Sequence, residues 1–263
     1  MNVLKKYSTI NYGIALLFSV WCCYSFTNAQ KPITAKKNDQ GKIILKLNLV
    51  FNEQALLLGN KAYINASGDS LIVDEFKCYI STLRFFNSKN QVSSEPNSYH
   101  LINAEDSSSL TISVTKIPAG NYIGLNFNIG IDSTTSVSGA LDGALDPTKG
   151  MFWAWNTGYI AAKLQGRSKK CNTLHHAFEY HIGGYLQPYH ALRNIDLKLQ
   201  NLKVESGKTT VIELKVDVAE WFKTPYLIDL SKTNNVVLPN KEAITIATNY
   251  SDMFSVSKTR DPF

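Results

Sequence analysis

The sequence predicts an all-β protein, an antiparallel β-sandwich of about eight to ten strands with long loops and little helix. Two observations carry this prediction. Several segments alternate apolar and polar residues with a period of two, which is typical of half-buried strands. Turn-forming residues separate these segments, at 67–69, 118–121 and 206–208. Helical periodicity is short, and we expect helical turns only at 219–222 and 249–254.

Residues 1–29 have the features of a signal peptide. Lys5 and Lys6 precede an apolar run at 14–21, and the segment ends in small residues up to Ala29. We expect cleavage before Gln30, which leaves 30–263 as a single exported domain, periplasmic or secreted. Later segments fall short of the roughly 20 apolar residues that a membrane-spanning helix needs. A lipoprotein is the less favoured alternative, because the bulky Trp21 precedes Cys22 where lipid attachment favours a small residue.

The charge balance argues against a nucleic-acid partner. The formal net charge is +6, and loss of Lys5 and Lys6 with the signal peptide leaves 6 − 2 = +4. The remaining lysines are scattered along the chain rather than gathered into the basic stripe that a phosphate backbone requires.

The exported chain keeps Cys78 and Cys171, which allow one disulfide or two free thiols. Cys78 lies on the apolar face of the segment 76–80, and this suits either state. Cys171 lies in the polar loop 167–172, where we expect a thiol to be exposed unless it is paired.

The predicted strands with one apolar face lie at 43–51, 123–131, 195–199 and 212–218. The segment 150–166 differs, because both of its faces are apolar at its start. Trp153, Trp155 and Tyr159 share one of these faces, and we predict that the segment forms the central strand. The loop 132–150 that leads into it is the longest irregular piece, which is typical of a functional segment.

Histidines are unusually concentrated near the middle of the chain. Four of the five fall within 16 positions: His175, His176, His181 and His190. On a strand, Glu179 and His181 share a face at about 7 Å and could share a metal ion, whereas His175 and His181 would be about 20 Å apart. A site on His181 therefore needs a ligand from elsewhere, and His100, in the apolar segment 98–102, is the leading candidate. The alternative is that each is a core histidine bonded to a backbone carbonyl.

Hydrolytic motifs are missing from the sequence. It contains no Gly-x-Ser-x-Gly elbow and no His-Glu-x-x-His, and we predict that the protein is not an enzyme. The three aspartates of the long loop, Asp132, Asp142 and Asp146, lack the spacing of a calcium loop and are typical turn formers.

The segments 151–159 and 178–184, together with 98–102, 132–133, 145–147 and 249–254, resemble the MbnP-like family of secreted copper-binding proteins. The resemblance implies a β-rich exported protein that binds copper through histidines. It also implies a tryptophan that a dihaem partner protein oxidises to kynurenine. Phe152, Ala154 and Tyr185 depart from relatives that carry histidine or cysteine at these places.

The resemblance implies His181 as a copper ligand with His100 as the second, and Trp153 or Trp155 as the residue that is oxidised. Glu179 is expected beside the site. The alternative function is a secreted β-sandwich module that supports structure or interaction without a metal.

Processing of the N-terminus can be tested by mass. We expect protein recovered from the periplasm or the medium to begin at Gln30. An intact mass that corresponds to a diacylated Cys22 would contradict export without an anchor.

Overall fold

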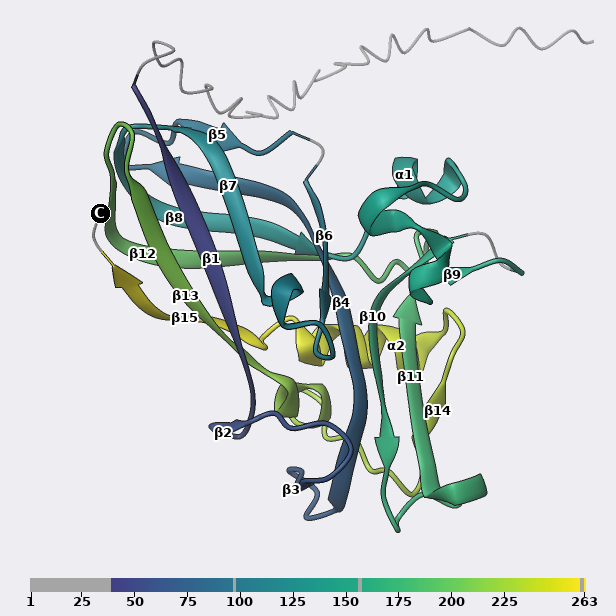
Figure 1. Cartoon of the computed structure of the whole chain (residues 1–263). Helices are drawn as coiled ribbons and strands as arrows, with labels where there is room; N and C mark the ends of the chain where they lie inside the picture. The colour runs from purple at the N-terminus through teal and green to yellow at the C-terminus, as the bar shows by residue number, and fades with distance from the viewer. Residues whose placement is uncertain (1–38, 97, 156–157, 261–262) are drawn as a thin grey trace, which may run out of the picture.

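Two β-sheets form the body of the protein (Figure 1). The structure, a computed structural model, describes residues 39–96, 98–155, 158–260 and 263. The smaller sheet contains β1 (Gln40–Phe51), β2 (Gln54–Ala55), β7 (Thr111–Pro118), β13 (Thr209–Asp217) and β15 (Phe254–Arg260). The larger sheet contains β3 (Ala62–Ile64), β4 (Ser70–Asn87), β5 (Val92–Ser94), β6 (Tyr99–Asn103), β8 (Gly120–Ile129), β9 (Phe152–Trp153), β10 (Gly158–Arg167), β11 (Ala177–Gly183), β12 (Arg193–Val204) and β14 (Asn235–Val236).

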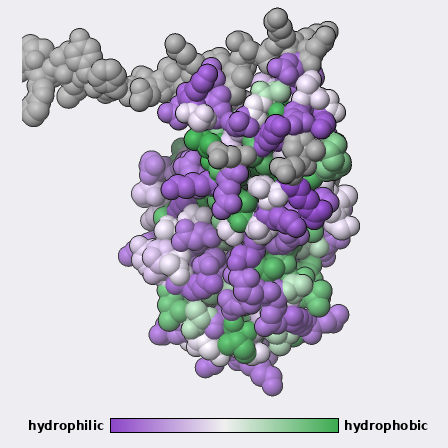
Figure 2. Space-filling view, turned by 90° about the vertical axis from the view of Figure 1, so that its left-hand side faces the viewer, coloured by the Kyte–Doolittle hydropathy of each residue, from purple (hydrophilic) through white to green (hydrophobic). Residues whose placement is uncertain are grey.

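The predicted all-β sandwich is confirmed, with more strands than the sequence indicated. The extra strands are short ones such as β2, β9 and β14, which have only two residues each and so show no alternation. Most apolar side chains face inward. The surface shown in Figure 2 is mainly hydrophilic, with hydrophobic side chains in small separate patches.

Strand β4 joins the two halves of the larger sheet. Along one edge its first half pairs with β10, from Ile72 to Cys78, and its second half pairs with β8, from Ile80 to Asn87. Strand β6 pairs with β4 at residues 77–81, and β11 pairs with the far side of β10. The order β6, β4, β10, β11 therefore runs across this part of the sheet.

The pairing is not wholly antiparallel. Strands β1 and β13 run parallel, from Lys42 opposite Thr209 to Val50 opposite Asp217, and β11 and β14 also run parallel. The sequence could not show this, because alternation reports which face is buried and not the direction of the neighbouring strand.

The prediction of one central strand over 150–166 was wrong in its extent. Residues 152–153 form β9, which turns back as an antiparallel partner of β10, with Gly158 opposite Trp153. Asn156 and Thr157, between them, lie outside the described residues. Strand β10 itself lies between β4 and β11, and its residues 158–162 are all buried.

The helices differ from the sequence prediction at the C-terminus. Helix α2 (Lys241–Tyr250) begins at the cap Asn240, whose side chain accepts a hydrogen bond from the backbone of Ala243 at 2.7 Å. The turn expected at 249–254 is present, with backbone hydrogen bonds from Asp252 to Asn249 and from Met253 to Tyr250, but the sequence did not reveal the helix that leads into it. The turn expected at 219–222 is the 3₁₀ helix η5 (Val218–Phe222).

Aromatic side chains fill the core between α2, η5 and the larger sheet. The ring of Trp221, fully buried, lies 4.9 Å from that of Tyr250 and 6.4 Å from that of Tyr180. Tyr180 points inward from β11, so this cluster ties the strand to the helix.

A second apolar cluster lies on the outer face of β4 and β10, beneath the loop 132–150. Its buried members are Tyr79, Ile131, Leu145, Met151, Trp153, Tyr159 and Ile160. The loop contains α1 (Ser133–Val137) and the 3₁₀ helices η2 (Gly143–Leu145) and η3 (Pro147–Lys149). Asp132 and Asp146 accept hydrogen bonds from the backbone of Thr135 and Thr148, which are capping roles.

Both described cysteines, Cys78 and Cys171, are buried and unpaired. The expectation that an unpaired Cys171 would be exposed was wrong. Its loop folds back onto β4, where the Ser168 hydroxyl donates to the Ser70 carbonyl at 2.6 Å. Burial raises the pKa of both thiols. No helix among the described residues is long and apolar enough to cross a membrane.

Candidate functional site

The outer face of β11 gathers the residues that the sequence singled out. Because side chains alternate along a strand, burial of Phe178, Tyr180 and Ile182 in the core turns the intervening residues outward. These outward residues are Glu179, His181 and Gly183. The strand register places His181 opposite Lys163 of β10, which in turn lies opposite Lys77 of β4.

His181 is partly buried, and its imidazole is neutral at physiological pH. Burial lowers its pKa to about 4, and the nearby ammonium of Lys163 adds to the effect, while Glu75 opposes it. The Nε2 atom of His181 lies 2.7 Å from the Nε2 atom of Gln165. Because an amide nitrogen only donates, the ring accepts at Nε2 and carries its proton on Nδ1.

A compact ion cluster lies beside His181. The Glu75 carboxylate contacts Lys77 Nζ at 2.7 Å and Lys163 Nζ at 3.0 Å. Burial alone would raise the pKa of Glu75, but the two lysines outweigh it and lower the pKa below its usual value. The Lys163 ammonium of this cluster favours the neutral form of His181, whereas the Glu75 carboxylate opposes it.

The tandem tryptophans have different environments. Trp153 is 5% exposed and Trp155 is 64% exposed, and their ring centroids are 5.7 Å apart. The ring of Trp153 lies on Gly183, where an added Cβ would be 2.8 Å from two ring carbons. Since Gly183 is two residues beyond His181 on the same face, the ring of Trp153 lies on the face of β11 to which that histidine belongs.

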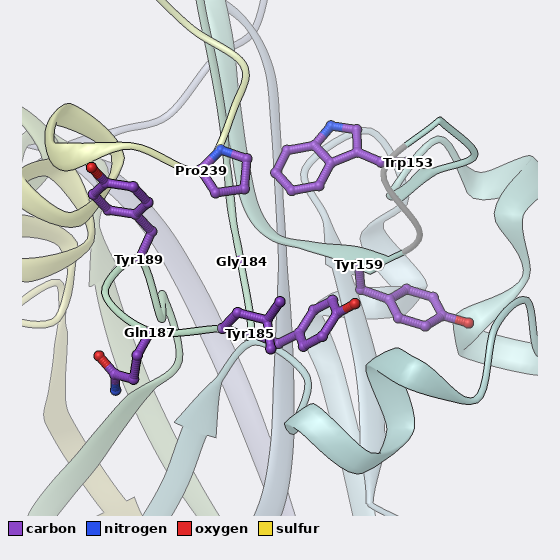
Figure 3. Close-up of a pocket in the computed structure, with 9 residues that line it drawn as sticks. Trp153, Tyr159, Gly184, Tyr185, Gln187, Tyr189 and Pro239 are labelled. Atoms are coloured by element: carbon purple, nitrogen blue, oxygen red, sulfur yellow. The ribbon is translucent and has the colours of Figure 1, made fainter.

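An aromatic pocket of about 160 Å³ continues from Trp153 beyond the end of β11 (Figure 3). It is lined by Trp153, Gly158, Tyr159, Gly184, Tyr185, Leu186, Gln187, Tyr189 and Pro239, none of which is charged. The Tyr159 hydroxyl points away from the pocket and donates to the Leu145 carbonyl at 3.0 Å. The phenol group of Tyr159 is therefore held by the loop 132–150.

His100 is not brought to His181. It lies on β6 opposite Ile80, whereas Asn103 is the β6 residue in line with Lys77, Lys163 and His181. Residues three positions apart on a strand face opposite sides, so His100 and His181 lie on opposite faces of the sheet. Three strand spacings add a separation of roughly 14 Å. His100 Nε2 instead pairs with Glu95 Oε2 at 2.7 Å.

The other predicted ligands are also dispersed. His175 and His176 lie in the turn between β10 and β11, at the opposite end of β11 from Trp153. In the parts of the chain that the structure describes, no group of three or more His, Cys, Asp or Glu side chains is placed to hold a metal ion.

Several residues of this region escaped sequence reasoning. The Glu75–Lys77–Lys163 cluster comes from two strands far apart in sequence, so no local pattern could reveal it. The pocket had one usable signal, the doublet Gly183-Gly184 at a strand end. Glycine there indicates close approach of other groups, and an added Cβ on Gly184 would lie 2.3 Å from the Tyr189 carbonyl oxygen.

Replacing Gly183 tests whether the ring of Trp153 packs against this glycine. We expect Gly183→Ala to destabilise the protein by about 1–3 kcal/mol, because its Cβ would collide with the indole ring and with the Tyr159 carbonyl oxygen. Gly124→Ala is the matched strand control, since its nearest contact would be an ordinary 3.7 Å. Urea denaturation followed by tryptophan fluorescence measures both, and equal stability of the two variants would contradict this packing.

Comparison with known proteins identifies the family of this chain. A search of curated proteins finds no match. Among solved structures it is similar to MbnP from Methylosinus trichosporium, with 12% identity and a TM-score of 0.48 over 72% of this chain and 79% of that one. The family model for MbnP matches residues 40–249. The match includes β11 and the pocket at its end, and the chain belongs to the MbnP family.

Proposed function

We propose that this member of the MbnP family is an exported copper-binding protein whose copper site is the outer face of β11. His181 is its nitrogen ligand, and Glu179 is the carboxylate two residues before it on the same face of β11. The observation that supports this site is the neutral imidazole of His181, with its pKa of about 4, on the face of β11 where the ring of Trp153 packs on Gly183. A neutral imidazole can bind a metal without first losing a proton.

A site shared by His181 and His100 does not fit the structure, because these residues face opposite sides of the sheet. The site that fits uses one imidazole and side-chain oxygens. Copper(II) accepts this mixture of nitrogen and oxygen ligands. Gln165 would have to release the Nε2 atom of His181, to which it is now hydrogen-bonded.

We also propose that a dihaem partner protein oxidises one of the tandem tryptophans. Trp155 is open to such a partner, being 64% exposed, whereas Trp153 is enclosed and packs on Gly183, two residues from His181. The centroids of the two rings are 5.7 Å apart, so the exposed side chain lies against the enclosed one.

The alternative is a binding module without metal. The ammonium groups of Lys77 and Lys163 support it, since they oppose the binding of a cation beside His181. The uncharged aromatic pocket at the end of β11 would then be the binding site.

Copper titration by calorimetry distinguishes these functions. We expect His181→Ala to abolish stoichiometric copper(II) binding and Glu179→Gln to weaken it about tenfold. His100→Ala is the matched control and should bind normally, as should a variant with both His175 and His176 replaced by alanine. Because the pKa of His181 is about 4, binding should persist at pH 5.5, where an unperturbed histidine is mostly protonated.

Unchanged copper affinity in His181→Ala would end the copper proposal at this site. Failure of copper to raise the melting temperature of the unaltered protein would favour the module without metal, because a ligand that binds only the folded state must stabilise it.

The oxidation is tested separately on protein from its native host. Peptide mass mapping over residues 150–163 should show kynurenine at Trp153 or Trp155, and recombinant protein made without the partner should keep both tryptophans intact. An unmodified peptide from the native host would remove oxidation from the function and leave the copper proposal standing.

A further inference from the structure

A second, larger pocket lies at the turn that joins β10 to β11. It has a volume of about 630 Å³. Its apolar walls include Ala62 of β3 and Ile72 of β4, and its basic residues are Arg167, Lys169 and Lys170. No acidic side chain lines it. We propose that this pocket binds an amphiphilic organic anion, a small molecule with an apolar body and one anionic head group.

The positive charges at this pocket are only loosely neutralised. Arg167 is 48% exposed and lies 3.5 Å from Asp74, and Lys170 is 62% exposed and lies 3.8 Å from Asp69. Both cations are substantially exposed and both contacts are long, so both cations can also interact with a ligand. Lys169 forms no ion pair with any residue that the structure describes. The pocket thus combines three cations with no carboxylate in its lining.

The turn that carries these charges is firmly attached. The Ser168 hydroxyl donates to the Ser70 carbonyl at 2.6 Å, and the Ser168 amide donates to the His176 carbonyl at 2.9 Å. His176 Nδ1 bonds the Cys171 carbonyl at 3.0 Å. Both His175 and His176 have φ of 57°, a left-handed backbone that is uncommon for histidine. A turn fixed in this way loses little entropy when a ligand binds.

The size and lining of the pocket select the ligand class. A volume of about 630 Å³ falls within the range of pockets that hold small organic molecules. An inorganic anion would leave most of it unfilled and its apolar walls uncovered. The apolar walls favour a hydrocarbon body. The arginine and lysines favour a carboxylate, sulfate or phosphate head group.

This pocket is independent of the proposed copper site. Arg167 pairs with Ala177 at the start of β11, whereas the proposed ligand His181 lies four residues further along the strand. The two positions are about 13 Å apart along the strand. Its positive charge opposes a metal cation, so the two sites have different ligands.

Decanoate, decanol and acetate test the proposal, because they separate the apolar body from the anionic head. We expect calorimetry with the purified protein to show decanoate binding at one site. Decanol and acetate should bind at least about tenfold more weakly. Decanol that binds as tightly as decanoate would overturn the role of the cations, and acetate that binds as tightly would overturn the role of the apolar walls.

Two variants locate the binding. Lys169→Gln with Lys170→Gln should weaken decanoate binding about tenfold, whereas the control pair Lys89→Gln with Lys149→Gln, exposed lysines outside this pocket, should not. Ala62→Phe places a ring in the lining and should weaken decanoate binding while the melting temperature stays close to that of the unaltered protein. The proposal would be refuted if the two lysine double variants lost the same decanoate affinity. It would also be refuted if both Lys169→Gln/Lys170→Gln and Ala62→Phe kept full decanoate affinity. Copper binding by these variants should be unchanged.

Discussion

The candidate site depends on the pleat of one short strand. Strand β11 turns Phe178, Tyr180 and Ile182 into the aromatic core, where Tyr180 lies against Trp221. This burial fixes the opposite face, because a shift by one residue would expose the core side chains and bury a histidine and a glutamate. The positions of Glu179, His181 and Gly183 on the outer face follow from packing on the inner one.

The same pleat explains why two histidines in strands of one sheet do not form one site. His181 faces outward toward Lys163, while His100 belongs to the other face, where it pairs with Glu95. The outer face contains a different set of charges. Lys77 and Lys163 both contact Glu75, while burial and the Lys163 ammonium keep His181 neutral. A neutral imidazole is suited to ligation, but the ammonium groups oppose a metal cation. The copper binding that we propose for this face therefore depends on the balance between these two effects.

The two ends of the β10–β11 hairpin are chemically unlike. At one end, the backbone approaches closely at Gly183 and Gly184, and this leaves room for aromatic rings and an uncharged pocket. At the other end, the turn gathers Arg167, Lys169 and Lys170 over apolar residues of β4. One hairpin thus offers two surfaces that select ligands of different charge.

Local pattern in the sequence determined the class of fold and part of the site. Alternation predicted the all-β sandwich and the face that Glu179 and His181 share, because the side-chain period of a strand is set by the backbone alone. Tertiary structure decided what no local pattern encodes. It made β1 and β13 parallel, turned the segment around Trp153 back on itself, and placed His100 away from His181. It also brought Glu75 to Lys163, although the two are far apart in the sequence. The physical reason is that a strand's periodicity specifies which side chains are buried, whereas its neighbours, their direction and their register depend on how the whole core packs.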